Sequence, residues 1–115
     1  MTNAKKEDWP EELSEPRADQ FTRGVFQDAN GCRCLMGWAE YDFYGSVPGR
    51  RDRITPGRFE AFRVFVATLQ DVLEEMTGEE RSVIGYNDHI LKTNRQRATA
   101  YRRAVVRSGY TEVVR

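Results

Sequence analysis

The sequence predicts an α+β domain, in which a small β-hairpin or three-stranded antiparallel sheet packs on two or three helices. Three observations lead to this fold class. Residues 21–27 (FTRGVFQ) mix aromatic and β-branched side chains and run into Asn30-Gly31, a strong hairpin-turn pair. Residues 56–77 carry apolar side chains at helical spacing, and Thr93-x-x-Gln96 is a capping box at the start of a last helix.

The hairpin is expected to lead directly into a first helix. Its returning strand is short, residues 32–34, because helical spacing of apolar residues begins at Leu35. Gly45 can end this helix. Apolar residues lie nearly all round it, so we expect it to be central in the domain.

The helix over residues 56–77 has the clearest boundaries in the chain. Thr55 can cap it, Pro56 suits its first turn, and Gly78 is a natural stop. Its apolar side chains form one stripe, which predicts that this helix supplies most of the core. The stripe consists of Phe59, Phe62, Phe65, Val66, Leu69, Val72, Leu73 and Met76.

The other segments have weaker patterns. Residues 46–57 predict a loop because they are rich in proline and glycine. Residues 82–92 predict a short strand or extended stretch that ends in a turn. The last helix follows and ends at Gly109, and residues 110–114 alternate weakly, which predicts a short edge strand.

Length and composition indicate one ordinary globular domain. We expect residues 1–16 to form a flexible acidic arm and residues 17–115 a single domain, because the arm has too few apolar side chains to offset the entropy of ordering. Trp9 is the one residue of this arm that we expect to be ordered, since a tryptophan in such an arm usually packs back on the domain. Residues 1–20 contain no apolar core and no run approaches the roughly 20 residues of a membrane span, so we expect a cytoplasmic protein without a signal peptide.

The two cysteines and the single histidine form the first candidate site. Cys32, Cys34 and His89 could bind zinc with Asp88 as a fourth ligand, but paired zinc-binding cysteines are usually separated by two to four residues. Alternatively, His89 could activate Cys34 as a nucleophile, with Asn87 or Asp88 orienting the imidazole. Free cysteines are more often buried as small apolar side chains, so we favour a structural role and expect no metal or cofactor.

Arginines form the second candidate site. Arg95, Arg102, Arg103 and Arg107 share the polar side of the last helix, and the loop before residue 56 adds Arg50, Arg51 and Arg53. Such a face could bind nucleic acid or another anionic partner. However, Lys plus Arg and Asp plus Glu each number 18, so the chain has no net charge. Zero net charge favours arginines that pair with the acidic arm and with the glutamates of residues 74–80.

Aromatic residues of the first helix form the third candidate site. Trp38, Tyr41, Phe43 and Tyr44 could line a pocket or a protein interface. In a small domain, such a run more often supplies the core and an amphipathic rim.

Two groups of motifs, Phe21-x-x-Gly24 with the turn that follows it and Asn87-Asp88 ahead of Thr93, resemble those of a group of small uncharacterised proteins of bacteria and their phages. In that group a segment like Phe21-x-x-Gly24 precedes a G-x-x-C-x-x-G turn into a helix, matched here by Gly31, Cys34 and Gly37. A downstream Asn-Asp pair, here residues 87–88, then precedes a helix that is capped by threonine. The resemblance implies a phage or prophage origin and carries no assigned activity.

These observations predict a small non-enzymatic protein that binds another macromolecule, with a protein as the first expected partner. A nucleic-acid-binding module that uses the arginine face is the alternative, and a cysteine-dependent enzyme is the third reading. No membrane partner is expected, and the sequence leaves the oligomeric state open.

Overall fold

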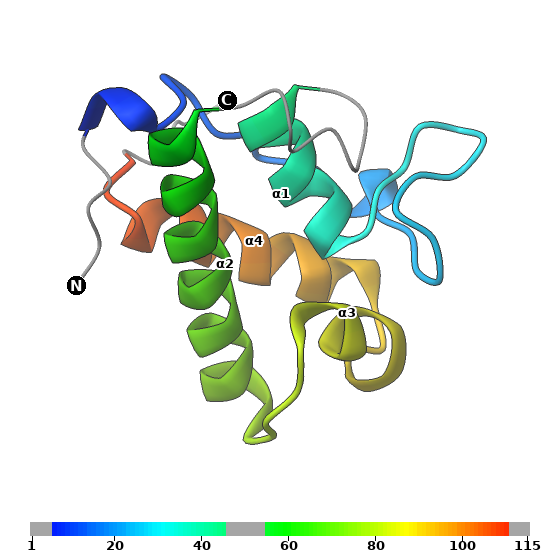
Figure 1. Ribbon diagram of the computed structural model, residues 1–115. Helices are drawn as coiled ribbons and strands as arrows, with labels where there is room; N and C mark the ends of the chain where they lie inside the picture. Colours follow the sequence, from blue (N-terminus) through cyan, green and yellow to red (C-terminus); the bar gives the residue numbers. More distant parts are fainter. Residues whose placement is uncertain (1–5, 46–54, 111–115) are drawn as a thin grey trace.

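The computed structural model describes residues 6–45 and 55–110 (Figure 1). Within these ranges the chain is mostly helical and has no strand. The main helices are α1 (Leu35–Tyr44), α2 (Pro56–Thr77) and α4 (Asn94–Arg107). The shorter elements are the 3-10 turns η1 (Lys6–Asp8) and η2 (Ala18–Gln20), the single turn α3 (Val83–Gly85) and the π-helical turn η4 (Tyr86–Ile90).

The predicted α+β fold is therefore wrong for the described residues. Instead of a hairpin ladder, residues 21–33 form a loop with two isolated bridges, Phe21 to Arg33 and Gln27 to Arg33. Around the turn, Asp28 N–H bonds the carbonyl of Cys32 and Cys34 N–H bonds the carbonyl of Phe26, and the chain makes a further reversal at Gly24, whose φ angle is 84°. Asn30-Gly31 does make a turn, but Asp28 closes it by accepting bonds from the backbone N–H groups of Asn30 and Cys32.

The extended stretch predicted over residues 82–92 is also wrong. Ser82 caps a helical turn there by accepting a bond from the backbone N–H of Gly85. The chain then continues through η4, where Leu91 N–H bonds the carbonyl of Tyr86. The edge strand predicted for residues 110–114 falls, apart from Tyr110, outside the described residues, as do Arg50, Arg51 and Arg53.

The three predicted helices are confirmed with their caps. The Thr55 side chain accepts from Arg58 N–H at the start of α2, and Gly78 ends α2 in the left-handed conformation with φ 73°. The capping box of Thr93 and Gln96 begins α4. Gly45 follows α1 as predicted.

α2 and α4 cross one another and, with α1, enclose the core (Figure 1). Phe65 of α2 lies at the centre, with its ring 5.5 Å from that of Phe43 and 5.4 Å from that of Tyr101. Leu69 and Leu73 continue the buried stripe of α2 as predicted, whereas Phe59, the first residue of the predicted stripe, is exposed. No helix in residues 6–45 and 55–110 is long and apolar enough to cross a bilayer.

The described part of the expected acidic arm lies against the helices. The ring of Trp9 packs 5.6 Å from that of Phe43, and Leu13 is buried. Ser14 donates from its backbone N–H and its hydroxyl to the two carboxylate oxygens of Asp42, at 3.0 and 2.5 Å. These contacts join residues 9–14 to α1.

Asp42 also accepts a 2.6 Å hydrogen bond from the hydroxyl of buried Tyr101. Burial raises the pKa of Asp42 above its usual 3.8, although the bonds from Ser14 and Tyr101 hold that pKa down. Burial and the neighbouring Asp42 charge raise the pKa of Tyr101. The pair thus links α1 and α4 through a half-buried carboxylate whose charged form is disfavoured by its loss of solvent.

Candidate functional site

The two cysteines occupy structural positions. Cys34 is the N-cap of α1, and its buried Sγ accepts a 3.3 Å hydrogen bond from Gly37 N–H. Burial raises the pKa of the Cys34 thiol, which disfavours the thiolate that a nucleophile needs. The half-buried Cys32 donates from Sγ to the carbonyl of Asp19 at 3.3 Å. Both geometries fit capping and packing.

The structure does not assemble the candidate metal ligands. In residues 6–45 and 55–110, no three His, Cys, Asp or Glu side chains cluster closely enough to hold an ion. His89 is exposed on η4. Asp88 instead accepts a 2.9 Å bond from Gly24 N–H and another from the side-chain amide of Asn87.

Asn87 is completely buried and joins three parts of the fold. Its Oδ1 accepts from Leu35 N–H at 3.0 Å, at the start of α1, and from Arg97 Nε at 3.2 Å. Its Nδ2 donates to the carbonyl of Thr22 at 3.1 Å. One amide side chain therefore holds the loop, α1 and α4 together.

Arg97 is the other half of this arrangement, and only 3% of it is exposed. Besides Asn87 Oδ1, its guanidinium donates to Asn94 Oδ1 at 3.0 Å, to the carbonyl of Leu91 at 3.1 Å and to the carbonyl of Asn87. Burial lowers the pKa of Arg97, and the charge of Arg23 lowers it further. We call Asn87, Arg97 and these contacts the Asn87–Arg97 network.

Sequence reasoning missed Arg97. The predicted polar side of the last helix consisted of Arg95, Arg102, Arg103 and Arg107, and Arg97 was assigned to neither side. Arg97 precedes Tyr101 by four residues and Ala104 by seven, which is the spacing of one helix face. That spacing could have identified it.

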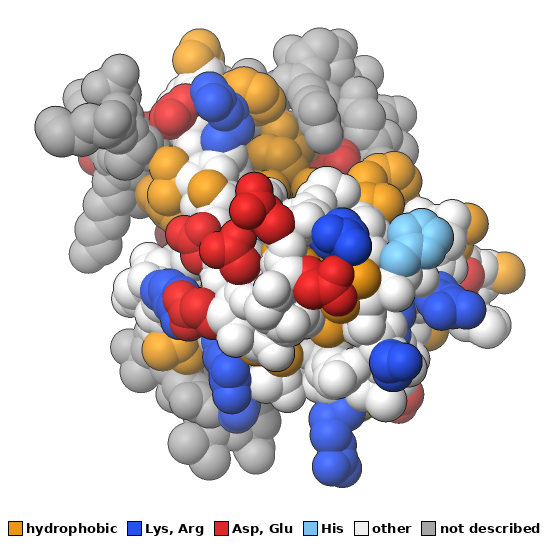
Figure 2. All heavy atoms as spheres, turned by 90° about the horizontal axis from the view of Figure 1, so that it is seen from below, with side chains coloured by type: hydrophobic (Ala, Val, Ile, Leu, Met, Phe, Trp, Pro, Cys, Tyr) orange, Lys and Arg blue, Asp and Glu red, His pale blue; other side chains and the backbone are white. Residues whose placement is uncertain are grey.

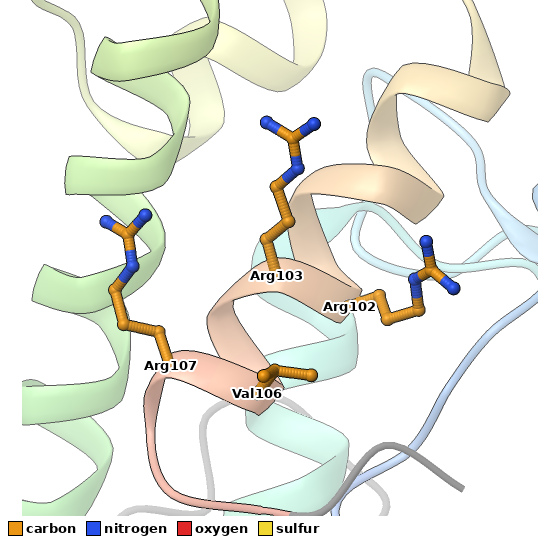
Figure 3. A pocket seen from close by; sticks show the side chains of 4 residues that line it. All are labelled: Arg102, Arg103, Val106 and Arg107. Carbon is orange, nitrogen blue, oxygen red and sulfur yellow. The ribbon is translucent and has the colours of Figure 1, made fainter. Parts of the chain in front are cut away.

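The arginine face is exposed but partly neutralised. Arg95, Arg102, Arg103 and Arg107 are all exposed on α4. Arg107 extends toward α2 (Figure 3). Its guanidinium donates two hydrogen bonds of 2.8 and 2.9 Å to the carboxylate of Glu75. These bonds lower the pKa of Glu75 and raise that of Arg107. The pairing agrees with the intramolecular alternative for this arginine.

Around Arg107 the surface is shallow and mixed in charge. Arg102, Arg103, Val106 and Arg107 line an open hollow of about 360 Å³. On the face of the molecule that is seen from below, acidic and basic side chains are interspersed (Figure 2). The carboxylate of Glu75 beside Arg107 interrupts the positive charge of the α4 arginines.

A different surface lies where the loop of residues 21–33 meets α1. Val25 and Phe26 are 50% and 38% exposed on this loop, which stands out from the helices (Figure 1). The guanidinium of Arg33 stacks 4.3 Å above the ring of Tyr41, which is 38% exposed, and 5.0 Å from that of Trp38. We call Val25, Phe26, Arg33 and Tyr41 the loop patch.

Gly37 brings the parts of the loop patch together. A Cβ at this position would lie 2.3 Å from the carbonyl oxygen of Phe26 and 3.2 Å from the Cβ of Arg33. Only glycine allows the loop to approach α1 this closely. Of the aromatic candidates in α1, Trp38 and Phe43 are buried in the core, whereas Tyr41 belongs to the loop patch.

Comparisons with protein-family models, with curated proteins and with solved structures find no match to this chain. The resemblance to small phage and bacterial proteins stays a prediction.

Proposed function

We propose that the protein is a small non-enzymatic binding protein and that it contacts a partner protein through the loop patch. The observation that carries the proposal is the pair of exposed apolar side chains, Val25 and Phe26, beside the stacked Arg33 and Tyr41. Aromatic residues and arginine are enriched in the centres of protein interfaces, where they supply much of the binding energy.

The loop patch is held in place before any partner arrives. Asp28 closes the turn through two backbone N–H groups, and Asn87 and Asp88 hold the loop at Thr22 and Gly24. A preordered loop loses less conformational entropy on binding than a mobile one. The fitting partner presents an apolar pocket for Phe26 and acidic groups for Arg33.

The proposal includes action in the cytoplasm, which the two free cysteines support. It also includes an origin in a phage or prophage, which only the sequence resemblance supports.

The second candidate function is a nucleic-acid-binding module, which is favoured by the exposed Arg95, Arg102 and Arg103 on one helix. Glu75 already binds Arg107, and the chain has no net charge, so we expect weak, salt-sensitive affinity for phosphate backbones at most.

A capture experiment with matched variants tests the proposal. Tagged wild-type protein, Phe26→Ser, Phe59→Ser and an Arg102→Glu, Arg103→Glu double variant are incubated in lysate of the source organism, with and without nuclease. Phe59 is the control because it is also 38% exposed but lies on α2. We expect Phe26→Ser to capture about tenfold less of one protein than the wild type does. A tenfold loss of affinity corresponds to ~1.4 kcal/mol, and truncation of an interface anchor costs at least that much.

Phe59→Ser, the double variant and nuclease treatment should all leave this capture unchanged. Capture that survives in Phe26→Ser would contradict the proposal. Capture that disappears with nuclease or in the double variant would support the arginine face instead.

A further inference from the structure

A second hollow, of about 450 Å³, lies between the loop and the beginning of α4. Its walls include three cationic side chains, Arg23, Lys92 and Arg97, together with Phe21, Thr22 and Asn94. Asn94 fixes the two sides to each other, because its Nδ2 donates to the Phe21 carbonyl at 3.2 Å and its Oδ1 accepts from Arg97. We call this space the cationic hollow.

The cations of the cationic hollow lack carboxylate partners. In the part of the chain that the structure describes, neither Arg23, Lys92 nor Arg97 forms an ion pair, whereas Arg107 and Arg81 pair with glutamates. Every acceptor of Arg97 is a neutral carbonyl or amide oxygen. A buried positive charge held only by neutral acceptors is costly, and a nearby anion would stabilise it.

Asp88 of η4 is the acidic group whose charge acts on Arg97, where it raises the pKa of the guanidinium. Partial burial acts to raise the pKa of Asp88, but the bonds from Asn87 and Gly24 and the charges of His89 and Arg97 outweigh that effect, so the pKa is lowered. Asp88 is therefore ionised at neutral pH. One carboxylate against three cations leaves an excess of positive charge around the cationic hollow.

Arg97 also keeps a donor for a ligand. A guanidinium has five N–H groups, and the hydrogen bonds of Arg97 within the described residues use four of them. One Nη1–H remains, and Arg97 lines the hollow. The first turn of α4 adds the positive end of its helix dipole on the same side.

We propose that the cationic hollow binds a phosphate group, either inorganic phosphate or a small organic phosphate monoester. Phosphate offers several acceptor oxygens and up to two negative charges, which match the three cations. The volume lies within the range of about 300–1,000 Å³ that is usual for small-molecule sites, and the polar walls favour an anion over an apolar ligand. This site goes beyond the proposed protein-binding function and does not depend on it.

Titration of ¹⁵N-labelled protein with sodium phosphate, phenyl phosphate and sodium chloride at equal ionic strength tests the site. We expect saturable shifts of the amide signals of Thr22, Arg23, Lys92 and Asn94 with both phosphate compounds and none with chloride. Tighter binding of phenyl phosphate would identify a monoester as the ligand class, and tighter binding of inorganic phosphate would identify the free ion.

Exposed cations provide the variant and its control. Arg23→Gln with Lys92→Gln should weaken phosphate binding about tenfold or more, because two charge-assisted contacts are lost, whereas Arg102→Gln with Arg103→Gln should bind like the wild type. Both double variants change exposed side chains, so unchanged far-UV circular dichroism is expected in each. Absence of saturation with both phosphate compounds, or equal binding in the Arg23 and Lys92 variant, would overturn the proposal. Shifts confined to Arg102, Arg103 and Arg107, which line the other hollow, would also overturn it.

Discussion

Replacement of Arg97 by methionine is expected to lower the free energy of unfolding by about 3–5 kcal/mol. Methionine retains much of the apolar stem but removes every donor, so the carbonyls of Asn87 and Leu91 lose their guanidinium bonds inside the protein. Each buried acceptor left without a partner costs about 1–3 kcal/mol, while relief from burying a charge returns part of the loss. Urea denaturation followed by circular dichroism measures the change.

Arg95→Met is the control for this variant. It removes the same charge from the same helix, but at an exposed position where substitutions usually change stability by about 0.5 kcal/mol or less. If Arg97→Met unfolded at the same urea concentration as Arg95→Met, the Asn87–Arg97 network would not be a major source of stability.

Tyr101→Phe is expected to destabilise the protein by about 1–3 kcal/mol at neutral pH and by less near pH 3.8. The pKa of Asp42 is higher in the folded protein than in the unfolded chain, so the protonated Asp42 carboxyl stabilises the folded state. This stabilisation is fully present below the unfolded-state pKa and is lost as the pH rises through the folded-state pKa. The Tyr101 hydroxyl helps to hold that folded pKa down. Without the Tyr101 hydroxyl the folded-state pKa of Asp42 rises further, so the protein loses more stability above pH 3.8.

Tyr86→Phe is the matched control for Tyr101→Phe. Both tyrosines are completely buried, but the Tyr86 hydroxyl donates to the backbone carbonyl of Glu79, which does not titrate. Its destabilisation should be the same at both pH values. Equal losses for Tyr101→Phe at neutral pH and near pH 3.8 would show that the hydroxyl does not control the Asp42 charge.

Sequence patterns predicted the helices well because each helix has local signals at both ends. Thr55, Pro56 and Gly78 bound α2, and Thr93 with Gln96 starts α4. Such caps act through hydrogen bonds within a few residues of the chain, so no knowledge of the tertiary structure is needed to find them.

The same patterns failed for residues 21–33 and 82–92 because tertiary contacts decide their conformation. β-Branched and aromatic residues favour a strand, yet the segment after Phe21 is bonded at Thr22 and Gly24 to Asn87 and Asp88, which lie more than sixty positions away. The same contacts position the loop patch, so its location could not be predicted from the sequence. The cationic hollow was missed for a related reason, since Arg23 and Arg97 are distant in sequence.

The proposed function depends most on the loop patch as the surface that contacts a partner protein. Site-specific photo-crosslinking tests this claim directly, with p-benzoylphenylalanine placed at position 26 and, as the control, at position 59. Phe26 and Phe59 are equally exposed at 38%, so chance encounters should label both positions alike. Irradiation in lysate of the source organism should give a discrete, nuclease-resistant protein adduct from position 26 and none from position 59. Equal adducts from both positions, or none from position 26, would contradict the proposed function.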